Sequence, residues 1–166
     1  KVYYDDLLGR AVSKFVPADD LVVPYTATSL DDAESVIHVI KISENDLRKQ
    51  QINGFYSDVE LSKPTDVTDA DKVAEKEREL EGVTKTTKAE NLYTLLECHV
   101  NLDLEGFEDV GEDGQPTEIK LPYVVTIEEG SQKVLSIRRN FAPNDPLKNK
   151  IQYFVHFKFL PGLGFY

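Results

Sequence analysis

The sequence predicts an α+β fold that is mainly an antiparallel β meander or sheet with a few short helices. Three observations predict it. Apolar and polar residues alternate in several runs, turns containing Gly or Pro separate these runs, and only short segments are rich in helix formers. Successive side chains of a strand point to opposite faces, so this alternation is typical of half-buried strands. The length of 166 residues fits a single domain over residues 1–166.

The first half of the chain contains strand-like pieces. Residues 11–16 and 21–24 are short pieces of this kind, separated by a turn at residues 17–20. Residues 35–42 (SVIHVIKI) favour a longer strand because they are rich in β-branched side chains.

One short helix is expected after this strand. Ser43, followed three residues later by Asp46, resembles a capping box with Asp in place of the usual Glu. Asn53 and Gly54 supply a left-handed exit at the other end. The helix is therefore predicted between these two signals.

Two connecting segments are strongly charged. Residues 62–90 are expected to form a charged helix or linker, and within them residues 69–81 (DADKVAEKERELE) have good helix formers but only a thin apolar stripe. Residues 106–117 (GFEDVGEDGQPT) form an acidic, Gly-bearing loop with little to bury.

The second half is expected to build most of the sheet. Gly-containing residues 129–132 would close a hairpin, and residues 142–146 would turn the chain once more. Hairpins in sequence imply an antiparallel meander with one solvated face. The alternating runs that predict its four strands are residues 92–104, 119–127, 135–137 and 151–159.

The first of these runs carries the polar residues of greatest chemical interest. Glu97, His99, Asn101 and Asp103 alternate with apolar residues and are expected on the solvated face. Residues two apart on a strand are ~6.6 Å apart, close enough to converge on one ion. One hypothesis is therefore a small metal-dependent hydrolase that uses Glu97, His99 and Asp103. With only one His among the four, the other interpretation is a solvated sheet face without metal.

Other catalytic constellations are absent from the sequence. None of the three histidines, His38, His99 and His156, has an adjacent glycine elbow or a reactive Cys. Cys98 lies on the apolar parity, so its thiol is predicted to be in the core and without thiolate character. No Gly-rich phosphate loop precedes a helix. We therefore predict no catalytic residue and no cofactor.

The charge is strongly negative and unevenly distributed. Thirty Asp and Glu against nineteen Lys and Arg give a net charge of −11, which argues against a free-standing nucleic-acid binder. Residues 91–119 hold eight carboxylates and no Lys or Arg, whereas residues 131–160 hold six Lys or Arg and one Asp. The two stretches are expected to pair opposite charges within the sheet.

The basic residues have two interpretations. They either form a solvated face that balances the acidic strand, or they contact a neighbouring subunit or phosphate. Alternation also requires one member of the Arg138–Arg139 pair to face inward or to reach an edge. The residues concerned are Lys133, Arg138, Arg139, Lys148, Lys150 and Lys158.

Targeting and redox signals are weak. No apolar run approaches the ~20 residues of a membrane helix, and the single Cys98 cannot form a disulfide within the chain. The chain begins on Lys1, contains no Met and ends on an aromatic segment, which predicts a piece of a longer polypeptide.

Four stretches, in this order, carry a family resemblance. The last of them (FVHFKFLPGLGFY) resembles the segment that leads into a long apolar helix in portal proteins of short-tailed bacteriophages. The other three are similar to stretches of the same family. The stretches are residues 15–29 (FVPADDLVVPYTATS), residues 53–58 (NGFYSD), residues 121–127 (LPYVVTI) with 134–140 (VLSIRRN), and residues 154–166.

The resemblance implies a structural virion protein rather than an enzyme. Portal proteins form a ring, usually of about twelve subunits, at one capsid vertex, through which double-stranded DNA is packaged and ejected without sequence-specific binding. Partners would be other portal subunits, the capsid and the terminase, and no membrane. The chain would be a wing-region fragment of a phage or prophage portal, located in the virion and, during assembly, in the host cytoplasm.

Overall fold

A computed structural model describes residues 1–5, 8–62, 92–111 and 113–157. Together they form an α+β fold, which confirms the predicted fold class. The predicted charged segment at residues 62–90, with its helix at 69–81, lies almost entirely outside the described residues. The elements are β1 (Val2–Asp5), β2 (Arg10–Ser13), the 3₁₀ turn η1 (Ala18–Asp20), β3 (Leu21–Val22), β4 (Ser35–Ile42), α1 (Glu44–Ile52), β5 (Tyr93–Leu102), β6 (Leu121–Glu128) and β7 (Val134–Arg139).

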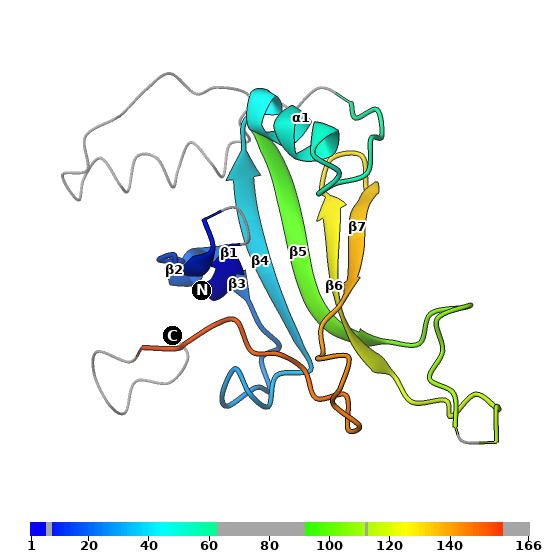
Figure 1. Cartoon of the computed structure of the whole chain (residues 1–166). Helices are drawn as coiled ribbons and strands as arrows, with labels where there is room; N and C mark the ends of the chain where they lie inside the picture. The colour runs from blue at the N-terminus through cyan, green and yellow to red at the C-terminus, as the bar shows by residue number, and fades with distance from the viewer. Residues whose placement is uncertain (6–7, 63–91, 112, 158–166) are drawn as a thin grey trace. The chain divides into compact units, whose positions relative to one another are not determined.

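The strands form one five-stranded and one two-stranded antiparallel sheet. The larger sheet has the order β3-β4-β5-β6-β7, so neighbours in space are also neighbours among the strands of the chain (Figure 1). In the smaller sheet β1 pairs with β2, with Val2 opposite Ser13. Strands β5, β6 and β7 therefore form the predicted meander, and β7 is an edge strand.

The prediction of a fourth strand in that meander is wrong. Residues 151–157 form no strand, although the preceding turn is present, with the Asp145 N–H donating to the Ala142 carbonyl at 3.0 Å. The apolar parity of the run faces solvent, since Val155 is 75% and Phe157 85% exposed. The buried residue is Phe154, of the opposite parity. This segment is held by the packed Phe154 ring and by separate hydrogen bonds, among them one from the Val2 N–H to the Tyr153 carbonyl at 2.7 Å, and not by the ladder of a strand.

The prediction of which face of β5 is buried is also wrong. Leu95 is fully buried and Tyr93 nearly so, whereas Leu92, on the parity expected inside, is 40% exposed. Cys98 is half-buried and not fully in the core. The face that carries Glu97 is thus the covered one. Strand β6 does not have the expected solvated face either, because most of its residues on both parities are buried.

Helix α1 begins and ends as the sequence predicts. Ser43 is its N-cap, and its hydroxyl accepts from the Asp46 N–H at 3.2 Å and donates to the Asp46 carboxylate at 3.0 Å. At the other end the Gly54 N–H donates to Gln51 and the Phe55 N–H to Gln50, which is a Schellman motif. Gly54 has φ +72°, a conformation that favours glycine.

Replacing the N-cap should measurably weaken this helix. Ser43→Ala is expected to lower the free energy of unfolding by about 1 kcal/mol, because the Asp46 N–H loses its acceptor. Urea denaturation followed by circular dichroism would measure the change. Ser43→Asp should retain most of the stability, and equal losses in both variants would contradict a capping role.

The described chain divides into two compact units. One contains residues 1–39, 97–125 and 137–166, of which 6–7, 112 and 158–166 are not described, and the other contains residues 40–96 and 126–136, of which 63–91 are not described. Strands β4 to β7 contribute residues to both, and each unit has its own cluster of buried hydrophobic side chains.

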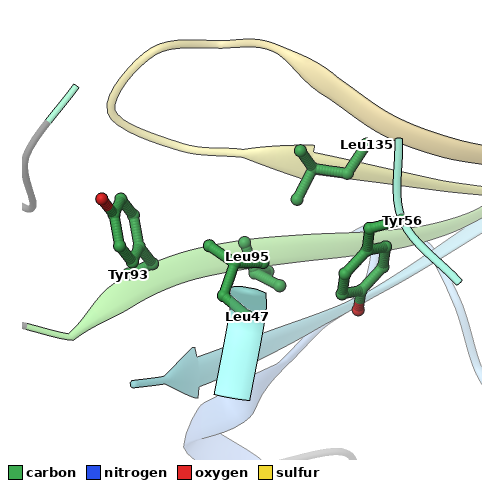
Figure 2. Close-up of a cluster of buried hydrophobic side chains, with 5 residues drawn as sticks. All are labelled: Leu47, Tyr56, Tyr93, Leu95 and Leu135. Atoms are coloured by element: carbon green, nitrogen blue, oxygen red, sulfur yellow. The ribbon is translucent and has the colours of Figure 1, made fainter. Parts of the chain in front are cut away.

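The cluster of the second unit surrounds Leu95. Figure 2 shows this side chain between Leu47 of α1, Tyr56, and Leu135 of β7, with Tyr93 further along β5. The segment after the helix is fastened over the cluster, because the Gln51 amide donates to the carbonyls of Ser57 and Val59 and the Ser57 N–H donates to Leu135. Residues 53–58 (NGFYSD) therefore contribute Tyr56 to the hydrophobic core of the second unit.

The cluster of the first unit includes Phe154. Its buried members are Leu30, Ala33, Val36 and Phe154, and Leu21, among others, packs against them. Lys150 anchors the approach to Phe154 by donating to the Ala33 carbonyl at 3.0 Å. The described chain contains no helix long and apolar enough to cross a membrane.

Candidate functional site

The candidate site is a covered carboxylate, Glu97, on β5. Strand β4 is hydrogen-bonded beside β5 and brings His38 to it, while His99 lies two residues further along the same face. The Lys1 side chain approaches from the start of the chain. The four side chains are 6–14% exposed, so the group is mostly withdrawn from water.

Two groups hydrogen-bond to the same oxygen of this carboxylate. The Lys1 Nζ donates to Glu97 Oε1, and the His99 Nε2 lies 2.8 Å from that atom. An ionised carboxylate only accepts, so the His99 Nε2 carries the proton. The His38 Nδ1 is 3.7 Å from Glu97 Oε1, beyond hydrogen-bonding distance, and has no hydrogen-bond partner among the described residues.

Aromatic rings close the site. Phe154 meets both histidine rings edge-on, at centroid distances of 5.7 Å to His38 and 5.1 Å to His99. The Lys1 ammonium lies 5.5 Å from the centroid of the Phe154 ring, a cation–π contact. Tyr153 adds a tilted contact to His99 at 5.6 Å. Two neighbouring rings of the 151–157 segment, Tyr153 and Phe154, therefore cover the site.

The environment keeps Glu97 ionised. Burial acts to raise the pKa of Glu97, but the two histidines and the Lys1 ammonium outweigh it and hold the pKa well below its usual range. Burial, followed by the charge of Glu97, raises the pKa of the Cys98 thiol. The same two causes, in the same order, raise the pKa of Tyr153, against a smaller opposing effect of Arg138. The Cys98 thiol is thus disfavoured as a thiolate, as predicted.

This arrangement suits a static ion pair better than acid–base chemistry. A general base works best when its pKa is near the operating pH. The pKa of Glu97 is lowered from its usual value, so it lies further from neutral pH than that of an ordinary carboxylate. The cavity beside His99 has a volume of about 10 Å³, room for roughly one water molecule. Asn140, which lines the same cavity, is buried and clamps the 151–157 segment through the Ile151 carbonyl at 3.2 Å.

The residues of the metal hypothesis are only partly brought together. Glu97 and His99 are in contact, whereas Asn101 and Asp103 are exposed and Asp103 lies beyond the end of β5. Among the described residues no three His, Cys, Asp or Glu side chains form a group that could hold a metal ion. The position next to the carboxylate is taken by the Lys1 ammonium.

The predicted basic residues have separate roles. Lys133 donates to the Glu60 carbonyl, and Lys148 forms an ion pair with Asp109 of the acidic loop. Arg138 and Arg139 are both exposed at the end of β7, an edge strand, so the Arg pair reaches an edge as alternation requires. Lys150 donates to the Ala33 and Leu30 carbonyls, and Lys158 lies outside the described residues.

Three members of this site, His38, Lys1 and Phe154, were not predicted from the sequence. His38 and Glu97 are far apart in the chain and meet only because β4 pairs with β5. Lys1 and Phe154 come from opposite ends of the sequence. The one usable signal was His38, a polar residue flanked on both sides by β-branched apolar residues within the strand SVIHVIKI.

Acid should weaken the fold through this carboxylate. The pKa of Glu97 is lower in the folded than in the unfolded state, so ionised Glu97 stabilises the fold. This contribution to the free energy of unfolding is complete above the unfolded-state pKa of about 4.3, and it is lost as the pH falls through the folded-state pKa. Hydrogen bonds from Ser131 and Gly130 outweigh burial and lower the pKa of Glu128 too, with the same sign. Urea denaturation between pH 7 and pH 3 should show stability falling below about pH 4.

The variant Glu97→Gln tests the origin of this dependence. Its stability should fall less steeply with acid than that of the wild type, by up to about 1.4 kcal/mol per pH unit. Glu105→Gln, at an exposed position, is the matched control and should leave the slope unchanged. Equal slopes in the wild type and Glu97→Gln would contradict the prediction.

The fold and this cluster place the chain among α+β proteins built on an antiparallel sheet, with a mostly covered carboxylate held by lysine and histidine. Comparison with protein families, with curated proteins and with solved structures found no match to the chain.

Proposed function

We propose that this chain is a structural assembly protein, part of the ring-shaped portal of a tailed phage or prophage. The observation that carries the proposal is the order of the four stretches similar to portal proteins of short-tailed phages, from residues 15–29 to residues 154–166. None of these stretches contains a catalytic signature.

The described parts of these stretches supply buried and clamping residues. Leu21 packs against the first unit's cluster, and Tyr56 is part of the second unit's. Asn140 and Phe154 are nearly inaccessible and hold the 151–157 segment in place. A structural scaffold requires stretches whose side chains form the hydrophobic core. The characteristic residues of an enzyme family, in contrast, usually line an open active site.

The geometry of the Glu97 site supports the same proposal. Its carboxylate is occupied by Lys1 and His99, Phe154 covers it, and the adjoining cavity has room for about one water molecule. A hydrolase needs space for its substrate beside the reacting groups. The metal-dependent hydrolase is therefore the less supported function.

Electron microscopy of the full-length gene product tests the proposal. We expect closed rings of about twelve subunits, since heterologous contacts that close on themselves generate rings. A full-length product that remains monomeric at all concentrations would overturn it.

Metal analysis tests the competing function on the same preparation. The purified protein is expected to contain no stoichiometric zinc or manganese and to fold normally without either. Stoichiometric metal that is lost on His99→Ala, together with hydrolytic activity, would favour the enzyme and contradict the proposal.

A further inference from the structure

The outer edge of β7 carries backbone groups that face away from the sheet. The Asn140 N–H, just after the strand, donates inward to Pro122 of β6 at 2.8 Å. Successive residues of a strand direct their N–H and C=O groups to alternate sides, so Arg139 and Ile137 direct theirs outward. The Leu135 carbonyl, of the same parity, does accept from outside the sheet, from the Ser57 N–H at 2.7 Å.

Within the part of the chain that the structure describes, this edge is unpaired at Ile137 and Arg139. No backbone hydrogen bond from another described segment reaches either residue, and both side chains are exposed, with Ile137 at 52%. An exposed row of N–H and C=O groups is a template for pairing with another chain, and proteins usually cover or blunt it. Here it combines hydrogen-bond donors, a cation and an apolar side chain.

The same unit also presents a surface of opposite charge. Residues 103–111 carry the exposed carboxylates Asp103 and Glu105 and the exposed apolar side chains Phe107 and Val110. Carboxylates accept strongly from backbone N–H groups and from guanidinium. The two surfaces therefore match in charge, in hydrogen bonding and in apolar content.

Within one copy the acidic segment is held by other contacts. Tyr123 donates to the Phe107 carbonyl at 3.2 Å, Val110 forms a bridge with Pro116, and Asp109 pairs with Lys148. No backbone hydrogen bond among the described residues joins it to Ile137 or Arg139 in the same copy.

We infer that the edge of β7 at Ile137–Arg139 binds the acidic segment 103–111 of a second copy of this chain. The contact joins different surfaces of the two copies, so it is head-to-tail and propagates into a ring or a filament. The inference rests on the proposed function, which supplies neighbouring copies, and it assigns the surfaces through which they meet.

Charge-reversal variants of the 166-residue chain test the contact by sedimentation equilibrium. The wild type is expected to self-associate reversibly, and raised salt should weaken the association, since exposed charges are screened. Arg139→Glu should weaken it about tenfold or more, because like charges then face one another. Arg10→Glu, an exposed arginine on β2 with the same change in net charge, is the matched control and should associate as the wild type does.

Mixing two defective variants gives the sharper test. Asp103→Lys/Glu105→Lys should also fail to associate alone, but an equimolar mixture with Arg139→Glu should restore association, since each reversed surface then meets its complement. Circular dichroism would establish that both variants fold. A wild type that stays monomeric up to millimolar concentration, or a mixture that does not associate, would overturn the inference.

Failure here is distinguishable from failure of the proposed function. Rings of the full-length product that form equally well with Arg139→Glu would refute this contact and leave the portal proposal intact. Absence of rings from the wild-type full-length product would refute the portal proposal, and the mixing experiment would still decide the contact.

Discussion

Leu95→Ala is expected to lower the free energy of unfolding by about 4 kcal/mol, the largest effect of any substitution considered. Leu95 is completely buried among side chains from α1, the following turn and β7. Truncation removes the transfer free energy of the lost carbons and leaves a cavity that this many-sided packing cannot close. Urea denaturation monitored by circular dichroism would measure the loss.

A matched control lies three residues earlier. Leu92 is 40% exposed and immediately precedes β5, so Leu92→Ala should cost less than about 1 kcal/mol. A loss at Leu95 no larger than that at Leu92 would contradict the assignment of Leu95 to the core of the second unit.

Glu97→Ala is expected to cost about 3 kcal/mol. The substitution leaves the Lys1 ammonium covered by Phe154 without its carboxylate and removes the acceptor of His99. An unpaired, partly buried charge loses hydration without compensation, so breaking one partner is more damaging than replacing the whole pair. Urea denaturation at pH 7 is the measurement, and Glu105→Ala, at an exposed position, is the control.

A double-mutant cycle separates the ion pair from packing. Lys1→Met and Glu97→Ala are combined, and the coupling between them should be about 1–3 kcal/mol, so that the double variant is more stable than the sum of single losses predicts. Additive losses, or a loss below about 0.5 kcal/mol for Glu97→Ala alone, would contradict a stabilising carboxylate at this position.

Local signals in the sequence predicted the elements well. The helix cap at Ser43, the left-handed Gly54 and the turn at residues 129–132 each depend on residues within a few positions of one another, and each is present. The β-branched run at residues 35–42 is β4 with the predicted bounds. Such features are decided by backbone geometry and short-range hydrogen bonds, which the local sequence contains.

The predictions that failed depend on which other segments pack against a strand or an alternating run. Strand β5 has leucine on both parities, so alternation alone did not decide which face is inside. The packing of Leu47 and Phe154 buried the parity of Leu95 and Glu97. Apolar and polar residues also alternate in residues 151–157, yet this segment forms no strand. Its Phe154 ring packs between His38 and His99 instead.

From the sequence alone came the α+β class, the approximate positions of β4, α1, β5, β6 and β7, and the separation of acidic from basic stretches, because these follow from periodicity, capping and charge along the chain. Only the tertiary structure decided that Glu97 is paired with Lys1 and His99 beneath Phe154, and that Arg139 lies on an edge strand of the described sheet. Those facts depend on contacts between residues up to about the full chain length apart, and the free energy of such contacts is set by burial and mutual distance, which no local pattern encodes.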